Sequence, residues 1–373
     1  MTSRLRKPWR EAATLIIAAK SHKISTNGFD YRILCMKRSE KTSFLNNHIC
    51  YPGGSTEEQD QASGWIEHFH KHGINLRDLN KLTLDYHRQK RGNALIFHDN
   101  DDSGQGQLLS KAISLRIGAI REAFEELGVL LCRSTASTSR KSSNFLRTND
   151  ILKFQQQVHD HEMTFLQLCQ QLNVVPDVFS LFEWSCWLTP TTFPSRRFLT
   201  AFFLCTINEQ LPIFPEPKEA FSYFWRTPEE YIQLLHQNEV WYHPPQYYEF
   251  CRLANFKEIE ELQNFLVTRE EQGSVLMMPI VTKCEDGMCF IFPGDEKYPK
   301  MPKLIAENTE AERFEGNLEE FREKSRILNR FEIKSPSEVE LHSNCDPING
   351  HKRPITTFDF LEKAGEDNLR TKL

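Results

Sequence analysis

The chain has 373 residues, a length that suits one large domain or two ordinary ones. Hydrophobic residues make up 39% and charged residues 26%, proportions that are ordinary for a soluble globular protein with a buried core. The formal net charge of −5 gives no general basic field, so nucleic acid is not an expected partner.

The first predicted element is a β-strand in the apolar run 12–19, which is too short to span a bilayer. Basic residues precede this run, so a mitochondrial targeting segment is the alternative interpretation. A turn at Asn27-Gly28 and the strand-like run 31–36 complete a predicted β-hairpin. Residues 49–51 then lead into a sharp loop at Pro52-Gly53-Gly54, and a mixed, polar stretch follows.

Helices and buried strands alternate farther along the chain. Helical patterns cover 108–127 and about 149–172, strand patterns cover 182–188 and 198–207, and Thr227-Pro228 begins a further helix. This alternation predicts an α/β or α+β layered fold. His159 and His161 are two residues apart on a predicted helix, which separates their rings and indicates a polar helix face. None of the ten cysteines forms a C-x-x-C pair, which argues against a zinc ribbon and favours reduced cysteines that pack as small apolar residues.

The helix predicted at 108–127 carries a group of carboxylates. On a helical wheel, one band is formed by Ile113, Ile117, Ile120, Phe124 and Leu127. Glu122, Glu125 and Glu126 fall on the opposite face, and Gly128 lies at the position that ends a helix. Most such clusters are solvated acidic faces. Close carboxylates repel each other, however, and Mg²⁺ or Mn²⁺ offsets that repulsion while leaving coordination positions open for water and phosphate. Arg121 can pair with one carboxylate and hold it in place.

The full pattern favours the metal site. Residues 121–129 match Arg-Glu-x-x-Glu-Glu-x-Gly followed by an apolar residue, the second half of the Nudix box. The first half requires a Gly, five residues and an acid, and Gly54 and Asp60 satisfy it with Asp in place of the usual Glu. About 53 residues are inserted between the two halves.

The chain resembles the nucleoside diphosphate-linked moiety X motif 19 family, peroxisomal Nudix proteins with a long insert in the box. The resemblance extends from about Arg10 to Pro299 and includes several long strings: Arg38-Ser39, Tyr51-Pro52-Gly53-Gly54, Trp65, 120–131, Thr189-Pro190, Arg196-Arg197-Phe198, Phe202-Phe203, Trp225, Pro228, 244–249 and Pro293-Gly294-Asp295. It implies a Nudix α/β/α sandwich with a mixed β-sheet. It also implies hydrolysis of the diphosphate of CoA and acyl-CoAs to adenosine 3′,5′-bisphosphate and (acyl-)phosphopantetheine, with Mg²⁺ or Mn²⁺ as cofactor.

Site residues follow from the matching positions. Glu122 and Glu126 would be the principal metal ligands, Glu125 would assist directly or through water, and Gly53 and Gly54 would let the backbone approach the metal or the phosphates.

The general base is either Glu122 or an acid outside the box. Glu219, six residues before Trp225, lies where many Nudix proteins place a further acid, although an exposed acid is an equal alternative. Arg38, Arg196 and Arg197 are candidates for the substrate phosphates, with an ordinary surface charge as the alternative for each.

The resemblance and composition predict a Nudix domain over 10–265, an insert over 61–107, a C-terminal extension over 266–365 packed on that domain, and a tail over 366–373. We expect the insert to pack near the site, and a lid or a pantetheine pocket is a hypothesis for it. The tail ends in Thr371-Lys372-Leu373, which resembles a peroxisomal signal read by an import receptor. The peroxisome is the expected location, with the mitochondrion and the cytosol as alternatives.

Two other functions remain open from the sequence. One is a Nudix hydrolase of another nucleoside diphosphate derivative, such as ADP-ribose, a dinucleotide or an RNA cap. The other is a non-catalytic nucleotide-binding Nudix module, which loss of the box carboxylates would favour; here they are intact.

Overall fold

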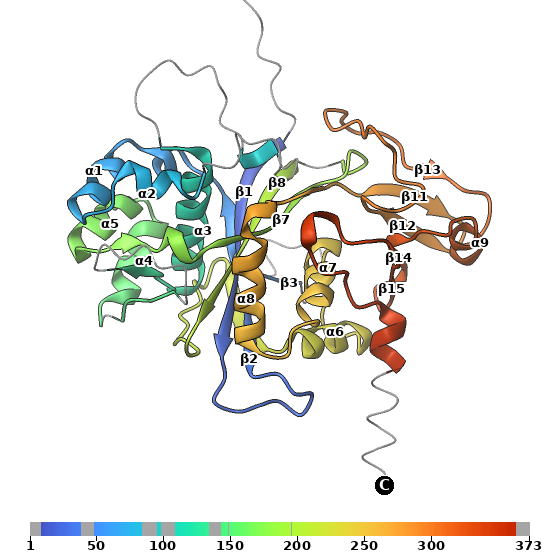
Figure 1. Ribbon diagram of the computed structural model, residues 1–373, viewed down its shortest axis with the longest axis horizontal. Coiled ribbons are helices and arrows are strands. Elements are labelled where there is room, and N and C mark those ends of the chain that lie inside the picture. Colours follow the sequence, from blue (N-terminus) through green and yellow to red (C-terminus); the bar gives the residue numbers. More distant parts are fainter. Residues whose placement is uncertain are drawn as a thin grey trace, which may run out of the picture.

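The computed structural model describes residues 9–38, 48–83, 95–97, 109–133, 143–147, 149–194 and 196–362. Within this part of the chain, an eight-stranded sheet forms the centre of the molecule (Figure 1). Its order is β10 (Leu276–Met277), β7 (Phe182–Leu188), β8 (Arg197–Ile207), β1 (Trp9–Lys20), β2 (Tyr31–Arg38) and β3 (Ile49–Cys50), with β4 (Gly53–Ser55) paired to β1 and β9 (Ala220–Arg226) paired to β2.

The sheet is mixed. β1 runs parallel to β8, and β10 runs parallel to β7, whereas the other pairs are antiparallel. The predicted hairpin is confirmed, because β1 and β2 pair antiparallel around Gly28, whose φ of 85° lies in the left-handed region. A short two-stranded sheet, β5 (Cys132–Arg133) with β6 (Val175–Pro176), lies apart from the central one.

Strand β1 is apolar because both faces of the sheet are covered. Side chains alternate across a strand, so Leu15 and Ile17 pack into one hydrophobic core and Ile16 and Ala18 into another. A strand buried on both faces is read in the sequence as one continuous apolar run.

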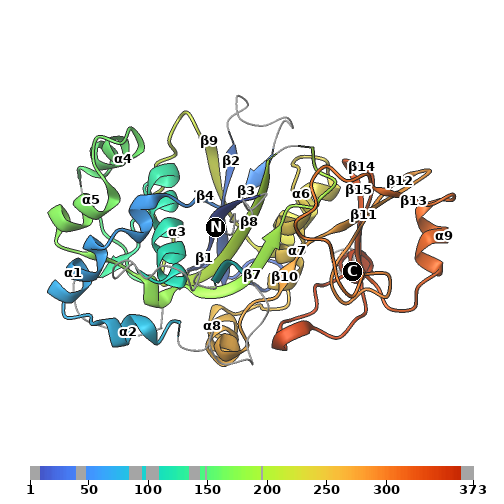
Figure 2. The same ribbon diagram turned by 90° about the horizontal axis from the view of Figure 1, so that it is seen from above.

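Helices cover both faces of this sheet (Figures 1 and 2). One side holds α1 (Gly64–Lys71), α2 (Leu76–Asn80), α3 (Lys111–Leu127), α4 (Ile151–His159) and α5 (Phe165–Leu172). The other side holds α6 (Pro228–His236) and α7 (Pro244–Leu253), and α8 (Ile259–Arg269) follows in the chain. This arrangement confirms the predicted α/β/α sandwich.

The single helix predicted over 149–172 was wrong, because it is interrupted. Helix α4 ends at His159, with Asp160 as its C-cap, and His161 has a φ of 57°, a left-handed conformation that a helix cannot continue through. A capping box between Thr164 and Gln167 then begins α5. The apolar periodicity on both sides of the break conceals it in the sequence.

The described part of the insert is built into the core. Its helices α1 and α2 and the short 3-10 turn Leu95–Phe97 contribute Trp65, Phe69, Leu79 and Phe97 to the same hydrophobic cluster as α3. The Trp65 indole also donates to the Gln59 carbonyl at 2.9 Å, directly beside the first half of the box. These residues therefore support the box helix, and a lid or a pantetheine pocket stays a hypothesis for the insert.

A second sheet follows the Nudix-like part. Its order is β13 (Glu312–Arg313), β11 (Ile280–Cys284), β12 (Gly287–Ile291), β14 (Asn329–Ser335) and β15 (Glu338–Ser343), and α9 (Leu318–Glu323) packs beside it. Figure 1 shows this sheet next to α6 and α7, on the far side from α3.

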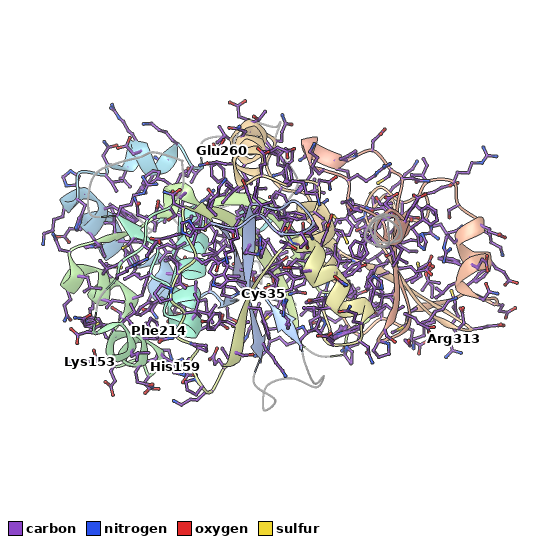
Figure 3. All side chains as sticks on the ribbon, turned by 90° about the horizontal axis from the view of Figure 1, so that it is seen from below. Cys35, Lys153, His159, Phe214, Glu260 and Arg313 are labelled. Carbon is purple, nitrogen blue, oxygen red and sulfur yellow. The ribbon has the colours of Figure 1, made fainter. Side chains whose placement is uncertain are left out.

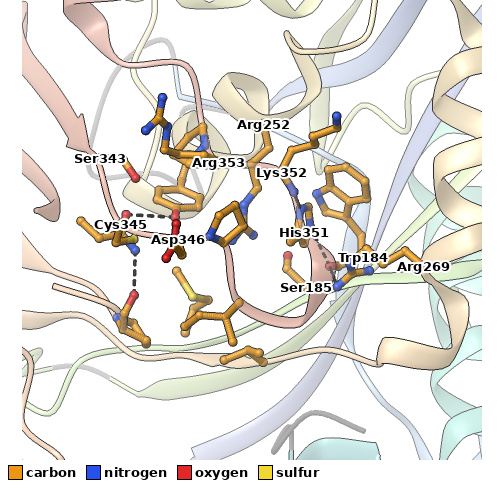
Figure 4. Close-up of a pocket in the computed structure, with 18 residues that line it drawn as sticks. Trp184, Ser185, Arg252, Arg269, Ser343, Cys345, Asp346, His351, Lys352 and Arg353 are labelled. Atoms are coloured by element: carbon orange, nitrogen blue, oxygen red, sulfur yellow. Dashed lines mark hydrogen bonds between the residues drawn. The ribbon is translucent and has the colours of Figure 1, made fainter. Parts of the chain in front are cut away.

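Buried polar contacts join the two sheets (Figure 4). The Tyr248 hydroxyl donates to Asn329 Oδ1 at 3.0 Å, and His351 Nε2 donates to the Trp184 carbonyl at 3.2 Å. Glu249, which is fully buried, accepts from the indoles of Trp184 and Trp187 at 2.7 and 2.8 Å. The Tyr248 and His351 bonds hold the C-terminal part against α7 and β7, and the Glu249 bonds hold α7 against β7 of the central sheet. Among the described residues, none of the helices combines the length and apolar character that crossing a membrane requires.

Candidate active site

Helix α3 carries the acidic group of the box. Its Ile117, Ile120, Phe124 and Leu127 are fully buried in the core, which fixes the rotation of the helix. Gly128 ends the helix with a φ of 69°, as predicted for this position. The carboxylates on the other side are thereby held at fixed positions along one turn.

The glycines of the first half-box lie directly against these carboxylates. The predicted sharp loop is in fact a short strand, in which Gly53 and Gly54 pair with Thr14 and Ala13 of β1. A Cβ atom on Gly54 would lie 2.4 Å from Glu122 Oε2, so any side chain there would displace the Glu122 carboxylate. The Gly53 amide donates to Glu126 Oε2 at 2.8 Å and fixes that carboxylate.

Arg121 lies at the centre of the site and is fully buried. Its guanidinium donates to both carboxylate oxygens of Asp60 at 2.9 and 3.1 Å. It also donates to Glu122 Oε1 at 2.9 Å and Glu125 Oε1 at 3.1 Å, and Glu57 Oε1 lies 3.6 Å away. One guanidinium therefore joins the two half-boxes across the insert.

Negative charge exceeds positive charge around Arg121. Burial, together with the charges of Glu125 and Glu219, raises the pKa of Glu122 to about 8, although Arg121 opposes this rise. Burial also raises the pKa of Glu125, with Glu57 and Asp60 adding to the effect and Arg121 opposing it. Crowded carboxylates of this kind are stabilised by a cation.

Glu219 approaches this group from another part of the chain. It immediately precedes β9, whose Ala220 pairs with Arg38 at the end of β2. Its charge adds to burial and to the charge of Glu125 in raising the pKa of Glu122. A role of Glu219 in the site stays a prediction.

The donor set fits a divalent metal ion. Glu122, Glu125 and Glu126 offer the carboxylate oxygens that hard cations prefer, and the missing side chain at Gly54 makes room for the Glu122 carboxylate. One guanidinium faces the carboxylates of Glu57, Asp60, Glu122 and Glu125, so the group has more negative than positive charge. Glu122, Glu125 and Glu126 would hold the ion.

The predicted phosphate-binding arginines differ in placement. The backbone of Arg38 lies opposite Ala220, next to Glu219, whereas its side chain is outside the described residues. Arg197 is buried and donates to the carbonyls of Thr189, Leu304 and Ala306 at 2.8 to 3.0 Å. Arg197 thus has a structural role that ties residues 304–306 to β8.

The register of β1 also separates Arg197 from the carboxylates. Arg197 is paired with Trp9, four residues along β1 from Ala13, the partner of Gly54. At about 3.3 Å per residue, that is about 13 Å along the strand. Arg196 is the exposed neighbour of Arg197.

Three residues of the site were not predicted. Glu57 could have been found, because it lies three positions after Gly54 within the half-box. Gln155 and Glu216 carry no motif, and only the three-dimensional structure places them at the end of α3.

A Gly-Gly strand and an Arg-Glu-x-x-Glu-Glu helix, brought together on an α/β/α sandwich, define a Nudix hydrolase. The family model described as the NUDT19 Nudix domain matches residues 9–253, and the model described as the NUDT19 C-terminal domain matches residues 281–344. The chain therefore belongs to the NUDT19 family of Nudix proteins.

Curated relatives agree with this assignment. Acyl-coenzyme A diphosphatase NUDT19 of Xenopus laevis is 33% identical over 94% of this chain and 96% of the relative. The proteins with the same name from Gallus gallus and Homo sapiens are 30% and 31% identical, over 95% and 78% of this chain and 97% and 80% of the relatives. As a Nudix enzyme, the chain is a hydrolase of diphosphate bonds, and enzymes of this class generally need a divalent metal ion.

Proposed function

We propose that this protein hydrolyses the diphosphate bond of CoA and acyl-CoAs, releasing adenosine 3′,5′-bisphosphate and (acyl-)phosphopantetheine, with Mg²⁺ or Mn²⁺. The carboxylate group around Arg121, with Gly54 against Glu122, is the observation that carries the chemistry. The substrate class is supported by the three relatives named acyl-coenzyme A diphosphatase, which align with most of this chain.

The chain's own residues prepare the site. Arg121 holds Glu122 and Glu125 in place, and the Gly53 amide holds Glu126. A bound divalent cation would polarise the diphosphate, neutralise charge on the leaving group and lower the pKa of a bound water. Glu122 and Glu219 are the two candidate bases, because they share one electrostatic environment.

The first experiment is an assay of the purified protein with CoA, acyl-CoAs, ADP-ribose and capped RNA in the presence of Mg²⁺ or Mn²⁺. We expect release of adenosine 3′,5′-bisphosphate from CoA or acyl-CoA, and its loss in Glu126→Gln. Preferential cleavage of ADP-ribose or capped RNA would replace the proposed substrate. A folded protein that binds CoA and cleaves none of the four would instead support the binding-module alternative.

The same assay separates the two candidate bases. Removal of the base abolishes proton abstraction, so its Gln variant loses more kcat than the other, by about 100-fold or more. Comparison of Glu122→Gln with Glu219→Gln at saturating metal identifies which carboxylate has this role. Equal and small losses in both variants would exclude both as the base.

We also propose that Thr371-Lys372-Leu373 directs the protein to the peroxisome through the import receptor. The tripeptide lies outside the described residues, and its sequence is what supports this proposal. A fluorescent fusion that keeps the tripeptide should enter peroxisomes, and a fusion lacking it should not. Identical distributions in the two fusions would refute the signal.

A further inference from the structure

We propose that Gln155 is a positioning residue that joins the last turn of the box helix to the loop that carries Glu219. The inference rests on the proposed function only in so far as Glu122 and Glu219 act on a substrate. The contacts that carry it are independent of which substrate is cleaved.

The end of α3 has a complete set of hydrogen bonds, and they come from three sources. The last four carbonyls of a helix have no partner within the helix. Here the carbonyl of Phe124 accepts from the Gly128 amide at 2.8 Å, within the helix cap. The carbonyls of Glu126 and Leu127 both accept at 2.9 Å from amides of a distant segment, those of Glu216 and Phe214.

The remaining carbonyl, that of Glu125, is satisfied by a side chain. Gln155 Nε2 of α4 donates to the Glu125 carbonyl at 3.0 Å and to the Phe214 carbonyl at 2.8 Å. Gln155 is buried, so these two bonds are not exchanged for water without cost. The Gln155 side-chain amide thus connects the box helix, at Glu125, to the loop, at Phe214.

The loop then leads to Glu219 through a second buried side chain. The carboxylate of Glu216 accepts from the backbone amides of Lys218 at 2.7 Å and of Glu219 at 3.1 Å. His159 at the end of α4 lies 3.9 Å from the same carboxylate, and Figure 3 labels His159 and Phe214 near one another on this side of the sheet. Gln155 and Glu216 are therefore consecutive links between α3 and Glu219.

This arrangement has a consequence for the distance between Glu122 and Glu219. Glu122 moves with α3, whereas Glu219 moves with the loop, so the bonds of Gln155 and Glu216 fix how the two residues lie relative to one another. Loosening the loop would change the geometry of the metal and water without removing any group that touches the substrate. Such outer partners commonly change metal affinity or activity by about 10- to 100-fold.

The test compares Gln155→Met with Gln156→Met. Methionine has a similar length and no donors, and Gln156 is the exposed neighbour on the same helix. We expect Gln155→Met to lose about tenfold or more in kcat, with KM for the nucleotide substrate within about twofold of the wild type. We also expect weaker Mn²⁺ binding, measured by electron paramagnetic resonance without substrate, and no change in either quantity for Gln156→Met.

The Mn²⁺ measurement separates this inference from the proposed function. If no diphosphate substrate is cleaved but Mn²⁺ binding weakens only in Gln155→Met, the positioning role stands and the proposed function fails. Wild-type Mn²⁺ affinity and kcat in a folded Gln155→Met protein would overturn the inference.

A second pair of variants covers a failure of Gln155→Met to fold. Glu216→Leu removes the acceptor for the Glu219 amide, whereas Glu216→Gln keeps a carbonyl oxygen that can accept the same bond. Loss of kcat in Glu216→Leu and its recovery in Glu216→Gln supports the link. Equal activity in both variants and the wild type overturns it.

Discussion

Replacing Arg121 with methionine tests whether the site depends on one buried cation. The guanidinium is fully buried and contacts Asp60, Glu122 and Glu125 within 3.1 Å, and Asp60 is itself 1% exposed. Removing one partner of a buried ion pair leaves an uncompensated charge, at a cost of about 3–5 kcal/mol in the free energy of unfolding. We therefore expect Arg121→Met to lose stability on that scale and to lose activity as Glu122 and Glu125 are released.

The matched control is Arg147→Met. Arg147 Nη2 lies 2.9 Å from Glu209 Oε1, the same distance as the Arg121–Asp60 contact, but the two side chains are 59% and 46% exposed. An exposed pair contributes about 0–1 kcal/mol, so this variant should unfold as the wild type does.

Urea unfolding of the metal-free proteins provides the measurement. The double variant Arg121→Met, Asp60→Asn should recover part of the loss, because the remaining buried partner is then neutral. If the free energy of unfolding of metal-free Arg121→Met lay within about 1 kcal/mol of the wild-type value, the reasoning would be refuted. Burial of the Arg121–Asp60 ion pair would then not make its loss costly.

Three further predictions concern single residues. Gly54→Ala should lose activity by about 100-fold or more, because its Cβ would lie 2.4 Å from Glu122 Oε2; CoA hydrolysis at the wild-type rate would contradict this. The pKa of Glu122 is raised from 4.5 to about 8 in the folded protein. The contribution of this carboxyl group to the stability of the metal-free protein should therefore be complete below pH 4.5 and be lost as the pH rises towards 8. Urea titrations in EDTA should show this fall reduced in Glu122→Gln, and equal profiles would exclude it. Burial and the charges of Arg252 and Arg269 hold the pKa of His351 well below 6.5. The contribution of the neutral imidazole to stability should therefore be lost as the pH falls below 6.5, by up to about 1.4 kcal/mol per pH unit. Thermal unfolding of His351→Gln should lack this pH dependence.

The box and the fold class could be predicted because both depend on local patterns. The apolar band of α3 fixes which face carries the carboxylates, and the alternating cores around β1 require helices on both faces of the sheet. Glu219 could be placed from its distance to Trp225 through the resemblance alone, and its charge is one of the causes that raise the pKa of Glu122.

The remainder could not be predicted because it depends on which backbone groups lack partners after folding. Gln155 is an ordinary glutamine in a helical pattern, and its role exists only because the Glu125 carbonyl ends a helix nearby. Arg197 resembled a phosphate ligand by residue type, yet two of its partners are the main-chain carbonyls of Leu304 and Ala306, more than 100 positions away, which a local pattern does not reveal. The break at His161 was hidden by apolar residues that continue on both sides of it.

The interrupted box is physically reasonable because its halves are joined in space. Gly54 and Arg121 are 67 positions apart, nearly five times the separation that the box has without the insert of about 53 residues. If the insert behaved as a flexible loop, this longer connection would cost about 1.4 kcal/mol in closure entropy. Burying a large apolar side chain contributes about 1.5–3 kcal/mol, and the insert buries Trp65, Phe69 and Phe97 in the core beneath α3. The insert therefore stabilises the helix that it separates from the glycines, and the buried Arg121–Asp60 pair closes the gap between the two halves.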